Sequence, residues 1–86
     1  MAVRDVIRWL GESEHAKKVF EEIGKGRIGA MELGKSLGMK WWLLRHILEE
    51  LKEEGLVTEE EDGYVLTQKG EEVREILGSL EKVKEV

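Results

Sequence analysis

Apolar residues recur along this chain at spacings of three and four, which places their side chains on one face of a helix. Two such stripes open the sequence, Val3, Val6, Ile7 and Leu10, and then Ala16, Val19, Phe20 and Ile23. Gly11 lies between the stripes, and we expect it to end or bend the first helix. Ser13 is suited to cap the second helix, and Gly24 or Gly26 to stop it. The pattern therefore predicts two helices in succession.

A short helix and a longer one come next, with a glycine between them. The short helix is expected over residues 30–37, where the apolar residues are Met31, Leu33 and Leu37. Gly38 is expected to end it sharply, because glycine adopts the left-handed conformation at no steric cost. The longer helix is expected over residues 40–54, before Gly55, with an inward face of Leu44, Ile47, Leu48 and Leu51.

Two β-prone runs around an acidic turn predict a hairpin. The runs cover residues 56–58 and 64–66, and the Asp62-Gly63 pair between them favours a tight turn. Residues 27–28, earlier in the chain, fit a very short strand. Thr67 then suits the cap of a last helix that ends near residue 83, with the apolar stripe Val73, Ile76, Leu77, Leu80 and Val83.

These elements predict a mainly α chain (α+β) of four to five helices and one small hairpin. The sequence has 86 residues, which is enough for one hydrophobic core and too few for a second. We therefore expect a single domain over residues 1–86. Its parts are an N-terminal helix (1–12), a helical core (13–55), a hairpin region (56–67) and a C-terminal helix (68–86).

Two helices joined by a glycine turn and followed at once by a hairpin form a winged helix-turn-helix. Three segments carry the likeness: ELGKSLG at 32–38, LGMKWWLLRHILEELKEEGLV at 37–57 and GYVLTQKGEEV at 63–73. Over roughly residues 14–77, the chain resembles winged helix-turn-helix transcriptional regulators of the ArsR/MarR type. The resemblance implies a regulator that lays the helix over 40–54 in the major groove of duplex DNA. Winged helices also serve as protein–protein modules, so the fold alone does not decide the function.

The outward side of the predicted recognition helix supplies candidate DNA contacts. By the register of the resemblance, its outward residues are Lys40, Trp41, Trp42, Arg45, His46 and Glu49. Arg45 suits a bidentate bond to guanine, Lys40 suits a phosphate, and His46 can donate to a phosphate or a base acceptor. Further basic residues that would support DNA binding are Lys35, and, at the flank, Lys25 and Arg27. The alternative is that these residues form an ordinary solvated face.

The two tryptophans depart from the family pattern, which favours small polar residues at these positions. Neighbouring residues on a helix point about 100° apart, so Trp41 and Trp42 cannot both face the core. We expect one of them to pack into the core against Met39 and the first helix, and the other to stay exposed as an interface anchor. Burial of both is the alternative.

The hairpin turn is a second departure, because residues 59–62 are four acids in succession. Phosphate neutralisation by Lys and Arg supplies most of the affinity of a wing for DNA, so we expect no contact between this turn and phosphate. The acids fit either a solvated turn or a docking loop for a basic partner. Together with Trp41 and Trp42, they support a second hypothesis, a winged-helix protein–protein interaction module that does not bind DNA.

The charge distribution keeps both hypotheses open. The net charge is −5, yet residues 1–48 hold nine Lys/Arg against six Asp/Glu, whereas residues 49–86 hold five against thirteen. Residues 24–48 alone hold five bases and one acid. An acidic total argues against a nucleic-acid binder, but a local basic segment argues for one, because the electrostatic field follows local patches.

The two terminal helices predict a partner copy. The last helix carries the stripe Val73, Ile76, Leu77, Leu80 and Val83, and the first helix has a stripe of its own. We expect these stripes to exceed what one small core can cover, which predicts a homodimer through the last helix. The alternative is that the two helices pack on each other within one chain.

Other chemistry finds no support in the sequence. Residues 24–29, GKGRIG, match G-x-G-x-x-G, but a helix precedes them where a dinucleotide site requires a strand. His15 and His46 lack metal-ligand spacing and no nucleophile stands with a base, so we expect no enzyme, cofactor or metal. The chain has no cysteine and no long apolar run, and residues 4, 5 and 8 are charged, which predicts a cytoplasmic protein without a signal peptide. Its Glu- and Lys-rich, proline-free composition is compatible with a thermophilic source.

Overall fold

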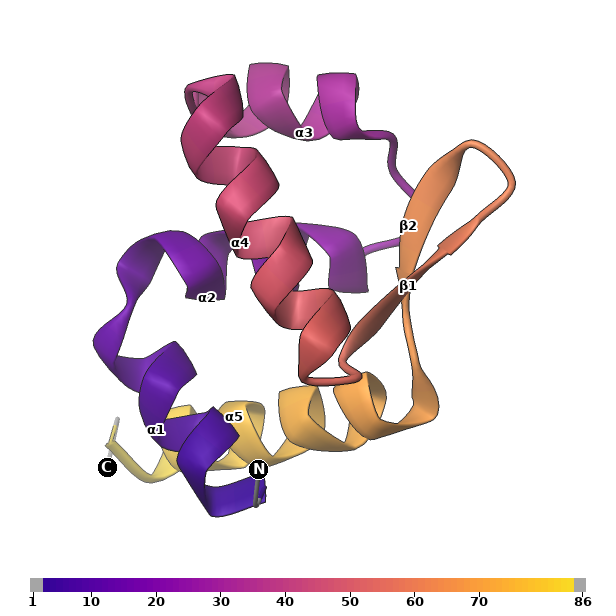
Figure 1. Ribbon diagram of the computed structural model, residues 1–86. Coiled ribbons are helices and arrows are strands. Elements are labelled where there is room, and N and C mark those ends of the chain that lie inside the picture. The colour runs from indigo at the N-terminus through magenta and orange to yellow at the C-terminus, as the bar shows by residue number, and fades with distance from the viewer. Residues whose placement is uncertain (1–2, 85–86) are drawn as a thin grey trace.

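The computed structural model describes the backbone of residues 3–84 and the side chains of residues 4–80. In chain order the elements are α1 (Val3–Glu12), α2 (Glu14–Gly24), α3 (Ala30–Leu37), α4 (Trp41–Glu53), β1 (Val57–Glu60), β2 (Gly63–Leu66) and α5 (Gln68–Lys84). Figure 1 shows α4 crossing the middle of the molecule, with α3 at one end, α1 and α5 at the other, and the hairpin along one side. The predicted class, mainly helical with one small hairpin, is confirmed for the described residues.

The end of α1 differs from the prediction, because the helix continues through Gly11 to Glu12. The Ser13 amide donates to the Trp9 carbonyl oxygen (3.0 Å) and closes the last turn. A glycine inside a helix costs only about 1 kcal/mol, which is less than burial of the Leu10 side chain contributes. The helix therefore ends one residue after the glycine expected to stop or bend it. The cap of α2 is confirmed, since the Ser13 side-chain oxygen accepts from an amide of the first turn at 3.3 Å.

α2 lies at the centre of the hydrophobic core and contacts α1, α3, α4, α5 and β2. Every residue of its predicted apolar stripe is buried, and the same holds for the predicted inward face of α4. Among the described side chains, the buried apolar residues are Val6, Leu10, Ala16, Val19, Phe20, Ile23, Leu33, Leu44, Ile47, Leu48, Leu51, Leu56, Val57, Val73 and Leu77. The periodicity thus predicted the two central interior faces correctly.

α1 is covered by its own chain. Val6 and Leu10 are fully buried, Ile7 packs against the same core, and α1 contacts both α2 and α5. The side chain of Val3, the remaining member of the predicted stripe, lies outside the described residues. The expectation that this stripe exceeds what one chain can cover is therefore wrong for its described part.

α5 divides its apolar residues between the core and the surface. Val73 and Leu77 are buried in the core, whereas Ile76 and Leu80 are 40 % and 48 % exposed. The side chain of Val83 lies outside the described residues. The surface of α5 that remains for a partner therefore centres on Ile76 and Leu80.

The hairpin is antiparallel, and its pairs are Val57 with Leu66, Thr58 with Val65, Glu59 with Tyr64 and Glu60 with Gly63. The connecting loop is residues 61–62, and Glu61 adopts a positive φ of 56°. Gly63 is already part of the strand, where a Cβ would lie 2.8 Å from the Arg27 side chain and 3.2 Å from the Ile28 backbone. The predicted short strand at 27–28 is reduced to one bridge between Ile28 and Tyr64. Asp62-Gly63 marked the hairpin correctly, but this glycine serves the close approach of residues 27–28.

Hydrogen bonds tie the end of α4 to the start of α5, and we call this region the α4–α5 junction (residues 54–56 and 67–70). The Thr67 hydroxyl donates to the Gly55 carbonyl oxygen (2.5 Å) and accepts from an amide of the first turn of α5 (3.1 Å), so the predicted cap is confirmed. The Thr67 amide donates to the Leu56 carbonyl oxygen at 3.0 Å. Lys69 Nζ donates to the Glu54 carbonyl oxygen at 2.8 Å. Three successive carbonyl groups after α4 thereby find partners at the start of α5.

Candidate nucleic-acid interface

A tight turn connects α3 to α4. Gly38 adopts the predicted left-handed conformation (φ 63°, ψ 32°), and the amides of Gly38 and Met39 donate to the Gly34 carbonyl oxygen. Lys40 is then the N-cap residue of α4. This turn places the first turns of α4 beside α3, at the end of the molecule opposite α1 and α5 (Figure 1).

Trp41 and Trp42 are both exposed, at 57 % and 68 %. Leu44 is buried at the start of α4, and Leu43 and Met39 pack partly buried against the same core. These three aliphatic side chains occupy the inward positions at this end of α4. The expectation that one tryptophan packs into the core is therefore wrong.

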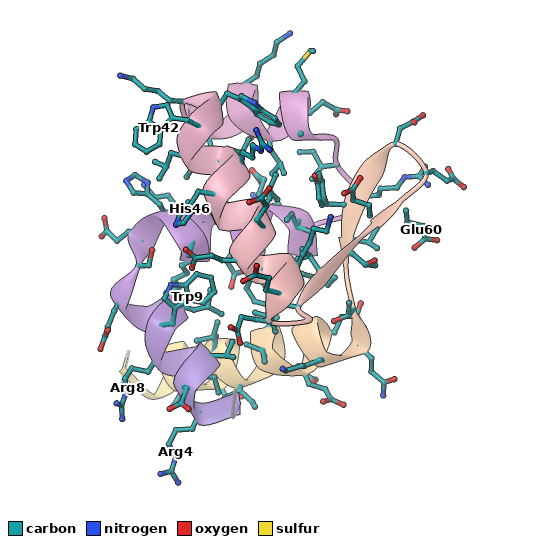
Figure 2. The ribbon with its side chains drawn as sticks, viewed as in Figure 1. Arg4, Arg8, Trp9, Trp42, His46 and Glu60 are labelled. Atoms are coloured by element: carbon teal, nitrogen blue, oxygen red, sulfur yellow. The ribbon has the colours of Figure 1, made fainter. Side chains whose placement is uncertain are left out.

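The two indoles lie on different sides of α4. Trp41 lines a cleft of about 150 Å³ between α4 and the hairpin, together with Arg45, Leu48 and Tyr64. Burial raises the pKa of the Tyr64 phenol. Trp42 lies on the other side of α4, where Figure 2 shows it in line with His46 of the next turn and Trp9 of α1. One helix end thus presents aromatic surface in two directions.

The basic side chains of α3 and of the first half of α4 differ in their contacts with carboxylates. Arg45 Nε lies 3.5 Å from Glu49 Oε1, and His46 Nε2 lies 2.5 Å from Glu50 Oε1, both within α4. Lys35 and Lys40 are exposed, and neither has an ion-pair partner among the described side chains. The two lysines are therefore the cations of this surface that can meet a phosphate without first leaving a carboxylate.

The predicted supporting cations are held by carboxylates. Lys25 Nζ lies 2.8 Å from a Glu22 oxygen, and Arg27 lies 2.6 Å from Glu61 in the hairpin loop. Hydrogen bonds from Lys25 and then Ser36 hold the pKa of Glu22 below its ordinary value. The positive potential of residues 24–48 is therefore weaker than their count of bases indicates.

The acidic end of the hairpin, residues 59–62, is only partly neutralised. Lys52 Nζ of α4 lies 2.8 Å from Glu59 Oε1, and this hydrogen bond raises the pKa of Lys52. Arg27 contacts Glu61, whereas Glu60 points away from the body of the molecule (Figure 2). The outer edge of the hairpin therefore remains negative and suits no contact with phosphate.

Two other features are absent from the described part of the chain. No group of three or more His, Cys, Asp or Glu among those side chains could hold a metal ion. Within residues 3–84, no helix combines the length and apolar character needed to cross a membrane. The GKGRIG segment begins at the last residue of α2 and leads into the bridge at Ile28, so a helix precedes it as expected.

The order of the elements decides the family. α3, the Gly38 turn and α4 are followed directly by the antiparallel hairpin and then by α5. A family model described as winged helix-turn-helix matches residues 17–85. The chain belongs to the winged helix-turn-helix family. No curated protein matches its sequence.

As a winged helix-turn-helix, the protein has α4 in the place of the recognition helix and the β1–β2 hairpin as its wing. The candidate residues Lys35, Lys40, Trp41 and Trp42 belong to α3 and the start of α4, whereas Lys25 pairs with Glu22 of α2 and Arg27 pairs with Glu61 of the wing. Sequence reasoning missed the part of Tyr64 in the cleft. Two sequence features could have pointed to it: Tyr64 belongs to a β-prone run, and residues 27–28 form a second short one. The bridge between Ile28 and Tyr64 joins residues far apart in the chain, so local patterns did not predict it.

Proposed function

We propose that this winged helix-turn-helix protein binds duplex DNA through α4 and regulates transcription in the manner of ArsR/MarR-type regulators. The observation that carries the proposal is the exposed first half of α4, which has unpaired Lys40 at its start and Arg45 one turn further. One face of α4 is fixed in the core, so the opposite face is held rigidly for a groove. The proposal assigns the protein to the cytoplasm and requires no catalytic residue, cofactor or metal.

Phosphate contacts set the expected affinity. Lys35, Lys40 and Arg45 would neutralise three phosphates, and each contact contributes about −0.9 to the slope of log K against log salt. The expected slope is therefore about −2.7, which is small for a specific regulator. The acidic wing adds no phosphate contact, so affinity has to come from α3 and α4.

Neutralising two cations of α4 tests the proposal. Lys40→Ala with Arg45→Ala is expected to weaken duplex binding roughly 100-fold at low salt and to reduce the salt slope by about two. Fluorescence anisotropy of a labelled duplex at several salt concentrations measures both quantities. Arg4→Ala with Arg8→Ala removes the same charge from α1, at the opposite end of the molecule (Figure 2), and should leave the slope unchanged. Unchanged binding in the α4 double variant would show that the assigned surface is wrong.

We also propose a homodimer through α5. Ile76 and Leu80 border a shallow depression with Glu72, Glu75 and Ser79, and their exposure favours an apolar contact. Val73 and Leu77 of the predicted set would support this contact from the core side. A two-fold axis near α5 would direct both copies of α4 outward, which suits palindromic half-sites.

The state of association tests the dimer. The wild type is expected to sediment at micromolar concentration with twice the mass of the 9.9 kDa chain. Ile76→Glu with Leu80→Glu should shift the protein to the monomer, because each protomer would then bury two unpaired carboxylates in the dimer contact. Met31→Glu changes a still more exposed apolar residue on α3 and should leave the dimer intact. A wild type that sediments only at 9.9 kDa contradicts the proposal.

A second function, protein–protein interaction without DNA binding, is favoured by a separate observation. Met31 of α3 is 76 % exposed, and α3 lies at the same end of the molecule as the first turn of α4, which carries the two tryptophans (Figure 1). Exposed aromatic and methionine side chains are enriched at protein interfaces. Lys35 and Lys40 beside them favour a negatively charged partner, which is the reason for placing DNA first.

A further inference from the structure

The exposed indoles of α4 indicate what form of DNA the surface fits. In a regular duplex the bases present their edges to a helix in the groove, and their faces are covered by stacking. An indole offers one N–H donor and no acceptor, so it reads little from base edges. Its flat faces are suited instead to stacking on a base that has lost its neighbours.

We propose that α4 binds DNA with unpaired bases, and that Trp41 and Trp42 each stack on one of them. The inference rests on the proposed function, because it takes α4 as the surface that meets DNA. Both indoles are more than half exposed, and they sit on adjacent residues at the free end of the helix. Because they point to different sides of α4, they would hold two separate bases rather than both faces of one.

The surroundings of Trp41 suit a base. The cleft that it borders has Leu48 and Tyr64 as apolar lining, and Arg45 and Glu49 at its edge supply hydrogen-bond donors and acceptors. Two ion pairs line this cleft, Arg45–Glu49 and Lys52–Glu59, and these charges largely cancel. A nearly neutral, partly aromatic cleft favours a base over a phosphate.

Two lysines without ion-pair partners among the described side chains lie close to the indoles, where the phosphates of a DNA strand with unpaired bases would pass. Lys40 directly precedes Trp41, and Lys35 lies on α3 at the same end of the molecule. Both are without ion-pair partners among the described side chains, so both can approach phosphates beside the stacked bases. The negative edge of the wing at Glu60 disfavours a continuous duplex lying along both α4 and the hairpin. Locally opened DNA avoids this repulsion and exposes base faces at the same time.

A comparison of DNA forms tests the inference. Three labelled ligands are used: a duplex, a duplex of the same length with a central block of mismatched bases (the bubble duplex), and the single strand. The bubble duplex is expected to bind about 100-fold more tightly than the duplex, because two bases would stack at about tenfold each, within the roughly 5- to 150-fold that stacking is worth per base. Trp41→Ala and Trp42→Ala should each weaken bubble binding about tenfold and should weaken duplex binding by a smaller factor.

Conservative and distant variants separate stacking from other effects. Trp41→Phe and Trp42→Phe keep an aromatic face and should retain most of the preference for the bubble duplex. Arg8→Ala shortens an exposed residue on α1, at the other end of the molecule (Figure 2), and should change neither affinity. In a Trp9→Phe background the tryptophan fluorescence comes only from Trp41 and Trp42, and the bubble duplex should quench this fluorescence more than the duplex does. Because the indoles are exposed, the melting temperature of each alanine variant should be nearly that of the wild type. A loss of DNA binding can then be assigned to the missing indole and not to unfolding.

The outcomes distinguish the inference from the proposed function. Equal binding of both duplex forms, with alanine variants that affect them equally, overturns the inference and leaves duplex binding by α4 in place. Failure to bind any of the three ligands overturns both. Fluorescence that changes with protein concentration and ignores DNA overturns the inference too, because it assigns the indoles to a protein contact.

Discussion

Gly70→Ala is expected to destabilise the protein by roughly 3 kcal/mol and to lower its melting temperature by roughly 15 °C. A Cβ built on Gly70 would lie 2.1 Å from the Leu56 carbonyl oxygen and 3.1 Å from the Leu56 carbonyl carbon. This oxygen also accepts the Thr67 amide, so it cannot move away without loss of a hydrogen bond. Relief requires a backbone shift in the α4–α5 junction. Urea unfolding followed by far-UV circular dichroism measures the change.

Gly78→Ala is the matched control for this prediction. Gly78 lies in the same helix, and a Cβ there meets no described atom within 4 Å. Alanine is favoured over glycine inside a helix, so this variant should be more stable by about 0.5–1 kcal/mol. Opposite signs for the two substitutions would assign the loss to the contact with Leu56. Similar small effects at both positions would show that the junction is looser than these distances indicate.

Phe20→Ala is expected to cost about 4 kcal/mol, a large part of the 5–15 kcal/mol that stabilises a typical domain. The Phe20 side chain is fully buried and is the largest in the core. It belongs to α2, which contacts every other helix and β2, so the cavity would lie where no single element can move to fill it. Urea unfolding of the variant should show a midpoint near zero denaturant or a partly unfolded protein without urea.

Met31→Ala is the control for removal of a large apolar side chain. Met31 is mostly exposed on α3, so its truncation should change stability by less than about 0.5 kcal/mol. A loss at Phe20 no greater than that at Met31 would contradict the assignment of α2 as the centre of the core.

The sequence predicted the elements wherever a local signal and a packing requirement agreed. Gly38 ends α3 because its left-handed backbone and the change of helix direction are both local, and residues 30–37 were predicted to the residue. Gly11 placed the end of α1 to within one residue, and its small local cost is outweighed by packing of α1 with α2 and α5, which no local pattern reports. Residues 67–70, which read T-x-x-G, were predicted only in part. Their Thr was predicted as a cap, but the need for Gly70 comes from Leu56, which lies across the junction.

The candidate site was predicted less completely than the fold. The inward face of α4 followed from periodicity, and its outward residues followed from the register of the resemblance. Whether Trp41 or Trp42 would be buried depended on whether Met39 and Leu43 would fill the inward positions. Charge pairing was also beyond local patterns. Arg27 counts as a free base in the sequence, yet its partner Glu61 lies 34 residues away and meets it only because the hairpin folds back toward residue 28.

The α4–α5 junction has a mechanical consequence. Carbonyl groups just after α4 accept hydrogen bonds from residues at the start of α5. These bonds restrict rotation about the connection, so we expect the two helices to move together as one rigid unit. In the proposed dimer, a small rotation of one α5 against the other would swing the free end of α4 through a larger arc. The separation of the two DNA-facing ends would then be governed at the far end of the molecule, by the contact that α5 makes with its copy.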